Sequence, residues 1–382
     1  MTLVYLLAGE HSGDVLGARL MAALRAARPG LQFAGVGGPR MIAEGMESLF
    51  PMQELAVMGL LEVLPRVLRL RRLMAAAEAD IRARRPGVLV TIDSPGFALR
   101  LLRRLRGAGI ARVHYVAPQV WAWRESRVRE FPGLWDRLLC LLPFEEAYFA
   151  RHGLPARFVG HPVLESGADA GDAARFRARH DLPPQARVLV LMPGSRRSEA
   201  PRLLPVFGAT LGLLASRVPA LVPVVPTAAA VAPIVRQATA AWPVPPLIVT
   251  DVAEKHDAYA AAAAALTKSG TSTLELALAG VPMAVTYRVN PLTGAIARRL
   301  IRVPHVAMVN LLAGRAVVPE LLQQDCRPDR LAATLAGLIE DADAAAAQRA
   351  AFRDVVARLR PPQRAPSAAA AAEVLQVLDG GG

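Results

Sequence analysis

Cysteine is scarce in this sequence, which contains only Cys140 and Cys326 among 382 residues. Two thiols are too few for a disulfide framework or a cysteine-based zinc site. Long apolar stretches are also missing. Although 53% of the residues are hydrophobic, no run approaches the roughly 18 apolar residues that indicate a membrane-spanning helix. The opening residues lead into Glu10 without a basic segment, so we expect no cleaved signal peptide and a cytoplasmic protein.

Lysine is almost absent as well, since it occurs only at positions 255 and 268. The net charge of +13 therefore comes mainly from arginine, with 45 basic residues against 32 acidic ones. A basic excess of this size is typical of proteins that bind nucleic acid, an anionic membrane surface or phosphorylated substrates. No signature of an RNA- or DNA-binding module is present, so the last two classes are favoured.

Several widespread catalytic motifs are missing too. The loop GEHSGD at residues 9–14 lacks the G-x-G-x-x-G spacing of dinucleotide-binding proteins, and no P-loop lysine follows it. A G-x-S-x-G nucleophile elbow is absent. His11 and Asp14 are too small a set for a metal site, so we predict no bound metal.

What the sequence does contain is an alternation of β-rich runs and helical patterns in both halves. The β-rich runs include residues 2–8, 88–92, 112–117, 138–142, 188–191, 221–225, 247–249, 263–267 and 283–287. This alternation predicts an α/β protein with two Rossmann-like, doubly wound parallel-sheet domains that face each other across a cleft. We place the domains at residues 1–166 and 173–360, and expect a last helix within 361–382 to return to the first domain.

Polar or glycine-rich clusters follow nearly every predicted strand, where ligands of such sheets bind. The stretch 268–288 shows this best, because it reads as a strand end, a tight turn, a helix and another strand. The small residues Ser269–Thr273 at the helix start either form an anion site on free backbone N–H groups or only cap the helix. Glu275, about one turn further, can accept hydrogen bonds from a sugar diol.

In the first half, Asp93 directly follows the apolar run 88–92. Its carboxylate can act as a general base, or Asp-Ser-Pro can simply cap the next helix. A carboxylate in one domain and a phosphate-type site in the other suit the transfer of a sugar from a nucleotide. A base activates the acceptor hydroxyl, and helix N–H groups with arginine stabilise the leaving diphosphate.

Seven motifs taken together carry more information than any one of them. They are Gly9–Asp14, Asp93–Pro95, Val116–Trp123, Phe158–Pro162, Pro193–Arg196, Ser269–Glu275 and Asn310–Glu320. In this order they resemble the motifs of bacterial lipid-A-disaccharide synthases, and the resemblance covers nearly the whole chain.

The resemblance implies an inverting glycosyltransferase of the GT-B type, family 19, that uses neither metal nor cofactor. The implied reaction joins UDP-2,3-diacylglucosamine to 2,3-diacylglucosamine 1-phosphate (lipid X) and gives a β-1,6-linked disaccharide 1-phosphate and UDP. Because both substrates carry acyl chains, the resemblance also implies peripheral association with the cytoplasmic face of the inner membrane. It allows a homodimer and implies no nucleic-acid partner.

The resemblance also assigns residues. Asp93 matches the family's proposed base, and Arg196 matches an arginine important for activity that is placed to meet the donor phosphates. The positions matching nucleotide-binding residues are Ser195, Ser269, Gly270, Thr271, Ser272, Thr273, Glu275 and Arg288. The positions matching the acceptor side or the cleft are Glu10, Ser12, Asp14, Trp121, Asn310, Glu320 and Gln323.

Four positions depart from the family pattern. After Asp93 the family usually has Asp-Phe-Asn, whereas this chain has Gly96 and Ala98 around its phenylalanine. That difference removes a partner for the proposed base. His11 and Gln119 replace smaller residues.

The segment 57–73, VMGLLEVLPRVLRLRRL, interleaves arginines with Leu, Val and Met. It either packs a helix against the core with a solvated arginine side, or lies in a membrane interface. The acylated substrates implied by the resemblance favour the membrane interpretation. The predicted membrane contacts are Met58, Leu60, Leu61, Leu64, Arg66 and Arg69.

Two rival functions fit parts of the pattern. Another sugar-nucleotide enzyme on the same fold, such as an epimerase or a peptidoglycan-type transferase, would act on unacylated UDP-sugars. A non-catalytic lipid or nucleotide carrier would not need a carboxylate at position 93.

The membrane interpretation predicts that polar substitutions at Met58, Leu60, Leu61 and Leu64 release the protein from membranes, because their apolar side chains would dip into the interface. Turnover of soluble substrate analogues should be retained. Cosedimentation with anionic vesicles measures the release, and unchanged cosedimentation would contradict the interpretation.

Overall fold

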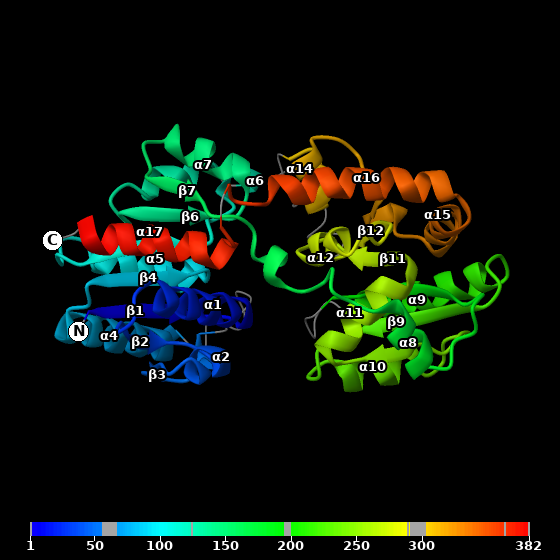
Figure 1. Cartoon of the computed structure of the whole chain (residues 1–382), viewed down its shortest axis with the longest axis horizontal. Helices are drawn as coiled ribbons and strands as arrows, with labels where there is room; N and C mark the ends of the chain where they lie inside the picture. Colours follow the sequence, from blue (N-terminus) through cyan, green and yellow to red (C-terminus); the bar gives the residue numbers. More distant parts are fainter. Residues whose placement is uncertain are drawn as a thin grey trace. The chain divides into compact units, whose positions relative to one another are not determined.

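The computed structural model describes residues 2–55, 67–123, 125–194, 200–288, 290, 303–362 and 364–380. The chain divides into two compact units. Unit 1 consists of Met1–Pro162 and Leu359–Gly382, and unit 2 of Val163–Arg358. Each unit is built on a parallel sheet with helices around it (Figure 1). The predicted fold class of two doubly wound α/β domains is thereby confirmed.

Unit 1 contains a seven-stranded sheet with the order β3-β2-β1-β4-β5-β6-β7. Its strands are β1 (Leu3–Ala8), β2 (Gln32–Val36), β3 (Glu47–Ser48), β4 (Val88–Ile92), β5 (Ala111–Tyr115), β6 (Arg137–Cys140) and β7 (Ala156–Phe158). All six neighbouring pairs are parallel. The central strands β1 and β4 are almost wholly buried, which explains why they read as continuous apolar runs rather than alternating ones.

The described helices of unit 1, except the last, lie between these strands in the chain. They are α1 (His11–Ala27), α2 (Pro39–Ala43), α4 (Val67–Arg84), α5 (Pro95–Arg104), α6 (Val120–Trp123), α7 (Pro143–Ala150) and α17 (Pro366–Gly380). Short 3-10 turns are η1 (Met52–Glu54), η3 (Glu125–Glu130) and η4 (Pro162–Glu165), the last of which leads into unit 2. The C-terminal helix α17 packs against α1 and the sheet of unit 1; Figure 1 shows it in red in the same unit as the blue N-terminus. Arg28 holds its end through two bonds of 2.8 and 2.6 Å to Asp379.

Unit 2 contains a six-stranded parallel sheet with the order β10-β9-β8-β11-β12-β13. Its strands are β8 (Arg187–Met192), β9 (Leu221–Pro226), β10 (Leu247–Val249), β11 (Ala262–Lys268), β12 (Met283–Tyr287) and β13 (Glu320–Leu322). Its helices are α8 (Ala173–Arg179), α9 (Ala200–Ala215), α10 (Ala232–Thr239), α11 (Val252–Ala261), α12 (Ser272–Leu278), α14 (Met308–Ala313), α15 (Pro328–Glu340) and α16 (Ala342–Arg358), with the turn η5 (Gln323–Asp325).

The strand order of each sheet reverses at one point. In unit 1 the chain runs outward in both directions from β1 and β4, and in unit 2 from β8 and β11. Loops that leave adjacent strands on opposite sides of a sheet open a crevice at the carboxyl ends, where ligands of such folds bind. The loops that follow β1, β4, β8 and β11 therefore mark the candidate site of each unit. Among the described residues, no helix is both long and apolar enough to cross a bilayer.

Candidate active site

Asp93 is the first residue after β4, at the reversal point of the unit 1 sheet. Its backbone N–H donates to the carbonyl of Tyr115 over 2.8 Å, which ties it to the neighbouring strand. Asp93 and Ser94 both have a left-handed backbone, with φ of 51° and 47°. Such a conformation costs a non-glycine residue about 1–2 kcal/mol and is concentrated at functional sites. The strain turns the chain abruptly and leaves the half-buried Asp93 side chain at the carboxyl edge.

In the alternative to the general-base interpretation, Asp93 only caps the helix that follows it. In the structure, the N-cap position of α5 belongs to Ser94, whose side chain makes no capping hydrogen bond. The loop after β1 lies directly against it, because a Cβ atom on Gly9 would come within 2.5 Å of the Ser94 Oγ. Only glycine fits there. Glu10, in the N-cap position of α1, is half-buried, and Ser12 is exposed in the first turn.

Asp14, predicted to face the acceptor side, is fully buried. Its Oδ1 accepts from the backbone N–H groups of Gly38 and Met41 over 2.9 and 3.0 Å, and its Oδ2 from that of Arg40 over 3.1 Å. These are the first N–H groups of α2, which have no partner within the helix. The carboxylate thus holds α2 on α1.

Glu145 is a buried carboxylate that the sequence analysis did not single out. Its Oε1 accepts from the indole N–H of Trp121 over 3.0 Å, and its Oε2 from the backbone N–H groups of Leu141 and Leu142 over 3.2 and 3.0 Å. It thereby joins the loop after β5 to the loop after β6. Burial raises the pKa of Glu145 to about 7, although the three donors counteract part of this shift. Trp121 also meets the ring of Phe144 edge-on at 4.9 Å.

In unit 2, the loops after β8 and β11 each carry a glycine with positive φ, 117° at Gly194 and 151° at Gly270. An L-residue would be strained at Gly270, and glycine lets the backbone approach a ligand closely. The predicted residues Ser195 and Arg196 lie outside the described residues. Arg288 is exposed just after β12.

The hydroxyl groups of Ser269, Ser272 and Thr273 donate to carbonyl oxygens instead of capping α12. Ser269 donates to Val306 O over 2.8 Å, and Thr273 donates to Gly270 O over 2.8 Å. Ser272 and Thr267 share a 2.9 Å bond, and Thr271, in the N-cap position, makes no side-chain cap. The plain-cap interpretation therefore does not describe this turn, because its hydroxyls brace its own backbone and bind it to Val306.

One carboxylate oxygen of Glu275 accepts hydrogen bonds from two neighbouring side chains. Lys255 donates to its Oε2 over 3.0 Å, and the Tyr259 hydroxyl donates to the same oxygen over 3.3 Å. The tyrosine hydroxyl also lies 3.4 Å from the sulfur of Met192 at the end of β8. The only other lysine of the chain, Lys268, ends β11 with its ammonium 5.8 Å from the ring centroid of Tyr287. Both lysines of the protein thus flank the candidate site of unit 2.

Asn310 and Glu320 form a buried network beside this site. Asn310 is fully buried, donates to the Glu320 Oε1 over 2.8 Å and accepts from the N–H groups of Val317 and Val318. Glu320 also accepts from the N–H of Val306 over 3.0 Å. Since the Val306 carbonyl is the acceptor of Ser269, the network positions the loop after β11. Gln323 is half-buried at the start of η5, with φ of 52°.

Of the predicted membrane contacts, Met58, Leu60, Leu61, Leu64 and Arg66 lie outside the described residues. Arg69, on α4, makes a two-bond ion pair with Glu54 of 2.9 and 2.5 Å. Within the described ranges, no three His, Cys, Asp or Glu side chains are grouped as metal ligands.

The model of the lipid-A-disaccharide synthetase family matches residues 4–374, a range that includes all seven motifs. The chain belongs to this family. The lipid-A-disaccharide synthases of Granulibacter bethesdensis and Gluconobacter oxydans are 63% and 62% identical to it. The alignments cover 98% of this chain in both cases, and 98% and 91% of the two relatives.

Solved structures show the same architecture. The glycotransferase of kitacinnamycin has a TM-score of 0.65 at 17% identity, over 99% of both chains. The UDP-N-acetylglucosamine 2-epimerase from Neisseria meningitidis, solved with UDP-GlcNAc bound, has a TM-score of 0.63 at 11% identity, over 100% of both chains. At these identities the likeness concerns the fold alone, so it does not favour an epimerase. This member of the lipid-A-disaccharide synthase family is a GT-B glycosyltransferase that forms the lipid A disaccharide.

The buried Glu145 makes the stability of unit 1 depend on pH. Its folded pKa of about 7 lies above the usual 4.5, so between these values the folded state holds a proton that the unfolded chain has lost. The free energy of unfolding should therefore fall as pH rises from 4.5 to 7, by roughly 3 kcal/mol from this group. Glu145→Gln, which does not titrate, should lack this component.

Urea unfolding at pH 5 and at pH 7.5, followed by tryptophan fluorescence, measures the effect. Burial lowers the pKa of His114 and of His161 to about 4. In the unfolded chain both imidazoles take up a proton below about pH 6.5, so they too change the free energy of unfolding in part of this range. They are present in both proteins, so the difference between wild type and Glu145→Gln isolates the carboxyl group. Parallel stability profiles of the two proteins would show that Glu145 is ionised in the folded state throughout.

Proposed function

We propose that this family member transfers a 2,3-diacylglucosamine unit from UDP to the 6-hydroxyl group of 2,3-diacylglucosamine 1-phosphate. The bond between the anomeric carbon and the UDP oxygen breaks, a bond to O6 of the acceptor forms on the opposite face of the sugar, and the proton of that hydroxyl passes to a base. The products are the β-1,6-linked disaccharide 1-phosphate and UDP. Membership of the family supports this choice over another sugar-nucleotide enzyme.

Asp93 is the base in this proposal. The observation that carries it is its position at the reversal point of the unit 1 sheet, on two consecutive strained residues. Asp14 and Glu145, the carboxylates described beside it, are only 0% and 2% exposed. A general base must have its carboxylate at the surface that receives the acceptor, and the half-buried Asp93 meets this requirement.

Unit 2 holds the UDP in this proposal. The loops after β8 and β11 bring backbone close to the ligand at Gly194 and Gly270, and Lys268 adds positive charge at the end of β11. A leaving diphosphate develops negative charge, which fixed positive groups stabilise. Glu275 accepts its two protein donors on Oε2, so we assign its Oε1 to the ribose diol. Arg196 keeps its predicted role at the donor phosphates, and Ser195 and Arg288 keep theirs as nucleotide-binding residues.

Membrane association and a homodimer stay predictions. The described start of α4 bears on the first, because Leu68 is 69% exposed there. Its apolar side chain beside a basic stretch suits a surface that meets lipid. The ion pair between Arg69 and Glu54 holds the same end of α4 to η1.

Replacement of the base should abolish turnover but not nucleotide binding. For Asp93→Asn we expect kcat to fall by about 10²- to 10⁴-fold, because the amide cannot take the acceptor proton. The Kd for UDP, measured by calorimetry, should stay within about twofold. The exposed Asp169 provides a matched control, and Asp169→Asn should retain full turnover. Wild-type activity in Asp93→Asn would exclude this residue as the base.

The two lysines allow a chemical test of the UDP site. Acetylation of ε-amino groups can modify only Lys255 and Lys268 in this chain. It removes their charge, so UDP affinity and turnover should both fall, and bound UDP should slow the acetylation of Lys268 as followed by mass spectrometry.

The control is the double variant Lys255→Arg with Lys268→Arg, which keeps both charges and has no ε-amino group. Whatever activity it retains should be insensitive to the reagent. Full UDP affinity in the doubly acetylated wild type would show that neither lysine contributes to the proposed UDP site.

A further inference from the structure

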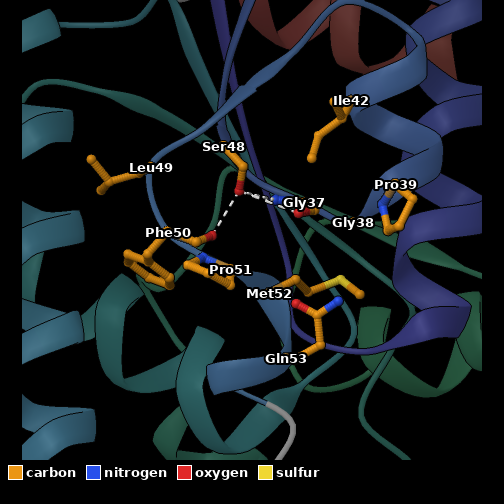
Figure 2. Close-up of a pocket in the computed structure, with 10 residues that line it drawn as sticks. All are labelled: Gly37, Gly38, Pro39, Ile42, Ser48, Leu49, Phe50, Pro51, Met52 and Gln53. Atoms are coloured by element: carbon orange, nitrogen blue, oxygen red, sulfur yellow. Dashed lines mark hydrogen bonds between the residues drawn. The ribbon is translucent and has the colours of Figure 1, made fainter.

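A cavity of about 390 Å³ opens at the carboxyl edge of the unit 1 sheet, beside β2 and β3. We call it the β2–β3 groove. Its lining residues are Gly37, Gly38, Pro39, Ile42, Ser48, Leu49, Phe50, Pro51, Met52 and Gln53 (Figure 2). Its size falls in the range of small-molecule sites, about 300–1,000 Å³. None of the residues assigned to the reaction lines it.

The groove offers little to a polar or charged ligand. None of its ten lining residues is charged. Figure 2 shows the Ser48 hydroxyl at its centre, which accepts from Gly37 N and contacts the carbonyls of Gly37 and Phe50 at 3.2 and 2.8 Å. The N–H groups at the start of α2, which would otherwise attract an anion, are occupied by Asp14. A phosphate or sugar would find few partners here.

The walls of the groove expose apolar side chains to water. Ile42 is 50% exposed and Leu49 is 39% exposed, and Figure 2 shows them on either side of Ser48. They are two of the six large hydrophobic side chains that are exposed among the described residues. Grouped exposed apolar residues in a concavity indicate a binding surface for an apolar ligand.

The groove also lies within reach of the proposed chemistry. In the sheet order, β2 and β4 are separated by β1 alone, so their carboxyl ends are about 10 Å apart. Both strands are parallel, which places the groove and Asp93 on the same edge of the sheet. A ligand whose sugar hydroxyl contacts Asp93 can extend a flexible apolar substituent across the end of β1 into the groove.

We infer that the β2–β3 groove takes one acyl chain of the lipid acceptor. This inference rests on the proposed function, in which the acceptor sugar meets Asp93. It assigns the groove a role in specificity, since the fit of the chain selects its length. Each methylene group that an apolar groove buries changes affinity by about fourfold, so a chain shorter by two methylenes should lose about 16-fold in kcat/KM.

Filling the groove should remove this selection. Ile42→Trp and Leu49→Trp enlarge side chains that are already part-exposed, so the core need not rearrange. For both variants we expect kcat/KM for the full-length acceptor to fall at least tenfold, and the penalty for the shortened acceptor to shrink below about threefold. Leu213→Trp is the matched control, because Leu213 is 47% exposed on α9 of unit 2. It should discriminate chain length as the wild type does.

A direct measurement is independent of these variants. An acceptor with a diazirine at the end of one acyl chain, irradiated with the wild-type protein in mixed micelles, should crosslink within residues 37–53, located by fragment-ion mass spectrometry. Crosslinks confined to other residues, or unchanged chain-length discrimination in both tryptophan variants, would overturn the inference. If the wild type makes no disaccharide from the full-length substrates, the proposed function itself fails.

Discussion

Burial of each parallel sheet on both faces is the constraint on which this structure depends. Strands such as β1 and β4 have no solvent-facing side, so polar chemistry is confined to the loops at their ends. Because all strands of a sheet run the same way, their carboxyl ends meet at one edge. That geometry brings Gly9 against Ser94 and the loop after β8 towards the loop after β11. The candidate base, the lysine-flanked turn and the apolar groove all lie on such edges.

The same edges explain why several acidic residues serve the scaffold. A parallel sheet with short loops leaves many helix N-terminal N–H groups without partners. Asp14 binds three of them at α2, Glu320 binds the loop before α14, and Glu145 joins two loops through an indole N–H. These contacts hold loops in place around a site. A residue of a functional motif is then needed for the shape of the site rather than for its chemistry.

The fold class followed from the sequence because apolar runs and glycine-rich breaks alternate along the whole chain. Two-residue β3 and three-residue β13 carry no such run, and neither was predicted. In the candidate site, position at a strand end singled out Asp93, but the sequence could not show that Asp14 is fully buried and holds the start of α2. The pairs Trp121–Glu145 and Lys255–Glu275 depend on which loops become neighbours. That is set by strand order and register, which local patterns do not encode.

Helix α17 has a consequence for the order in which the chain acquires structure. Ala370 and Val374 belong to the hydrophobic core of unit 1, yet they follow all of unit 2 in the sequence. During synthesis from the N-terminus, every residue of unit 2 is available before unit 1 can close its core. Unit 2 can therefore fold while unit 1 still exposes the apolar surface that α17 will cover. Unit 1 is therefore the first unit to be synthesised and the last to complete its hydrophobic core.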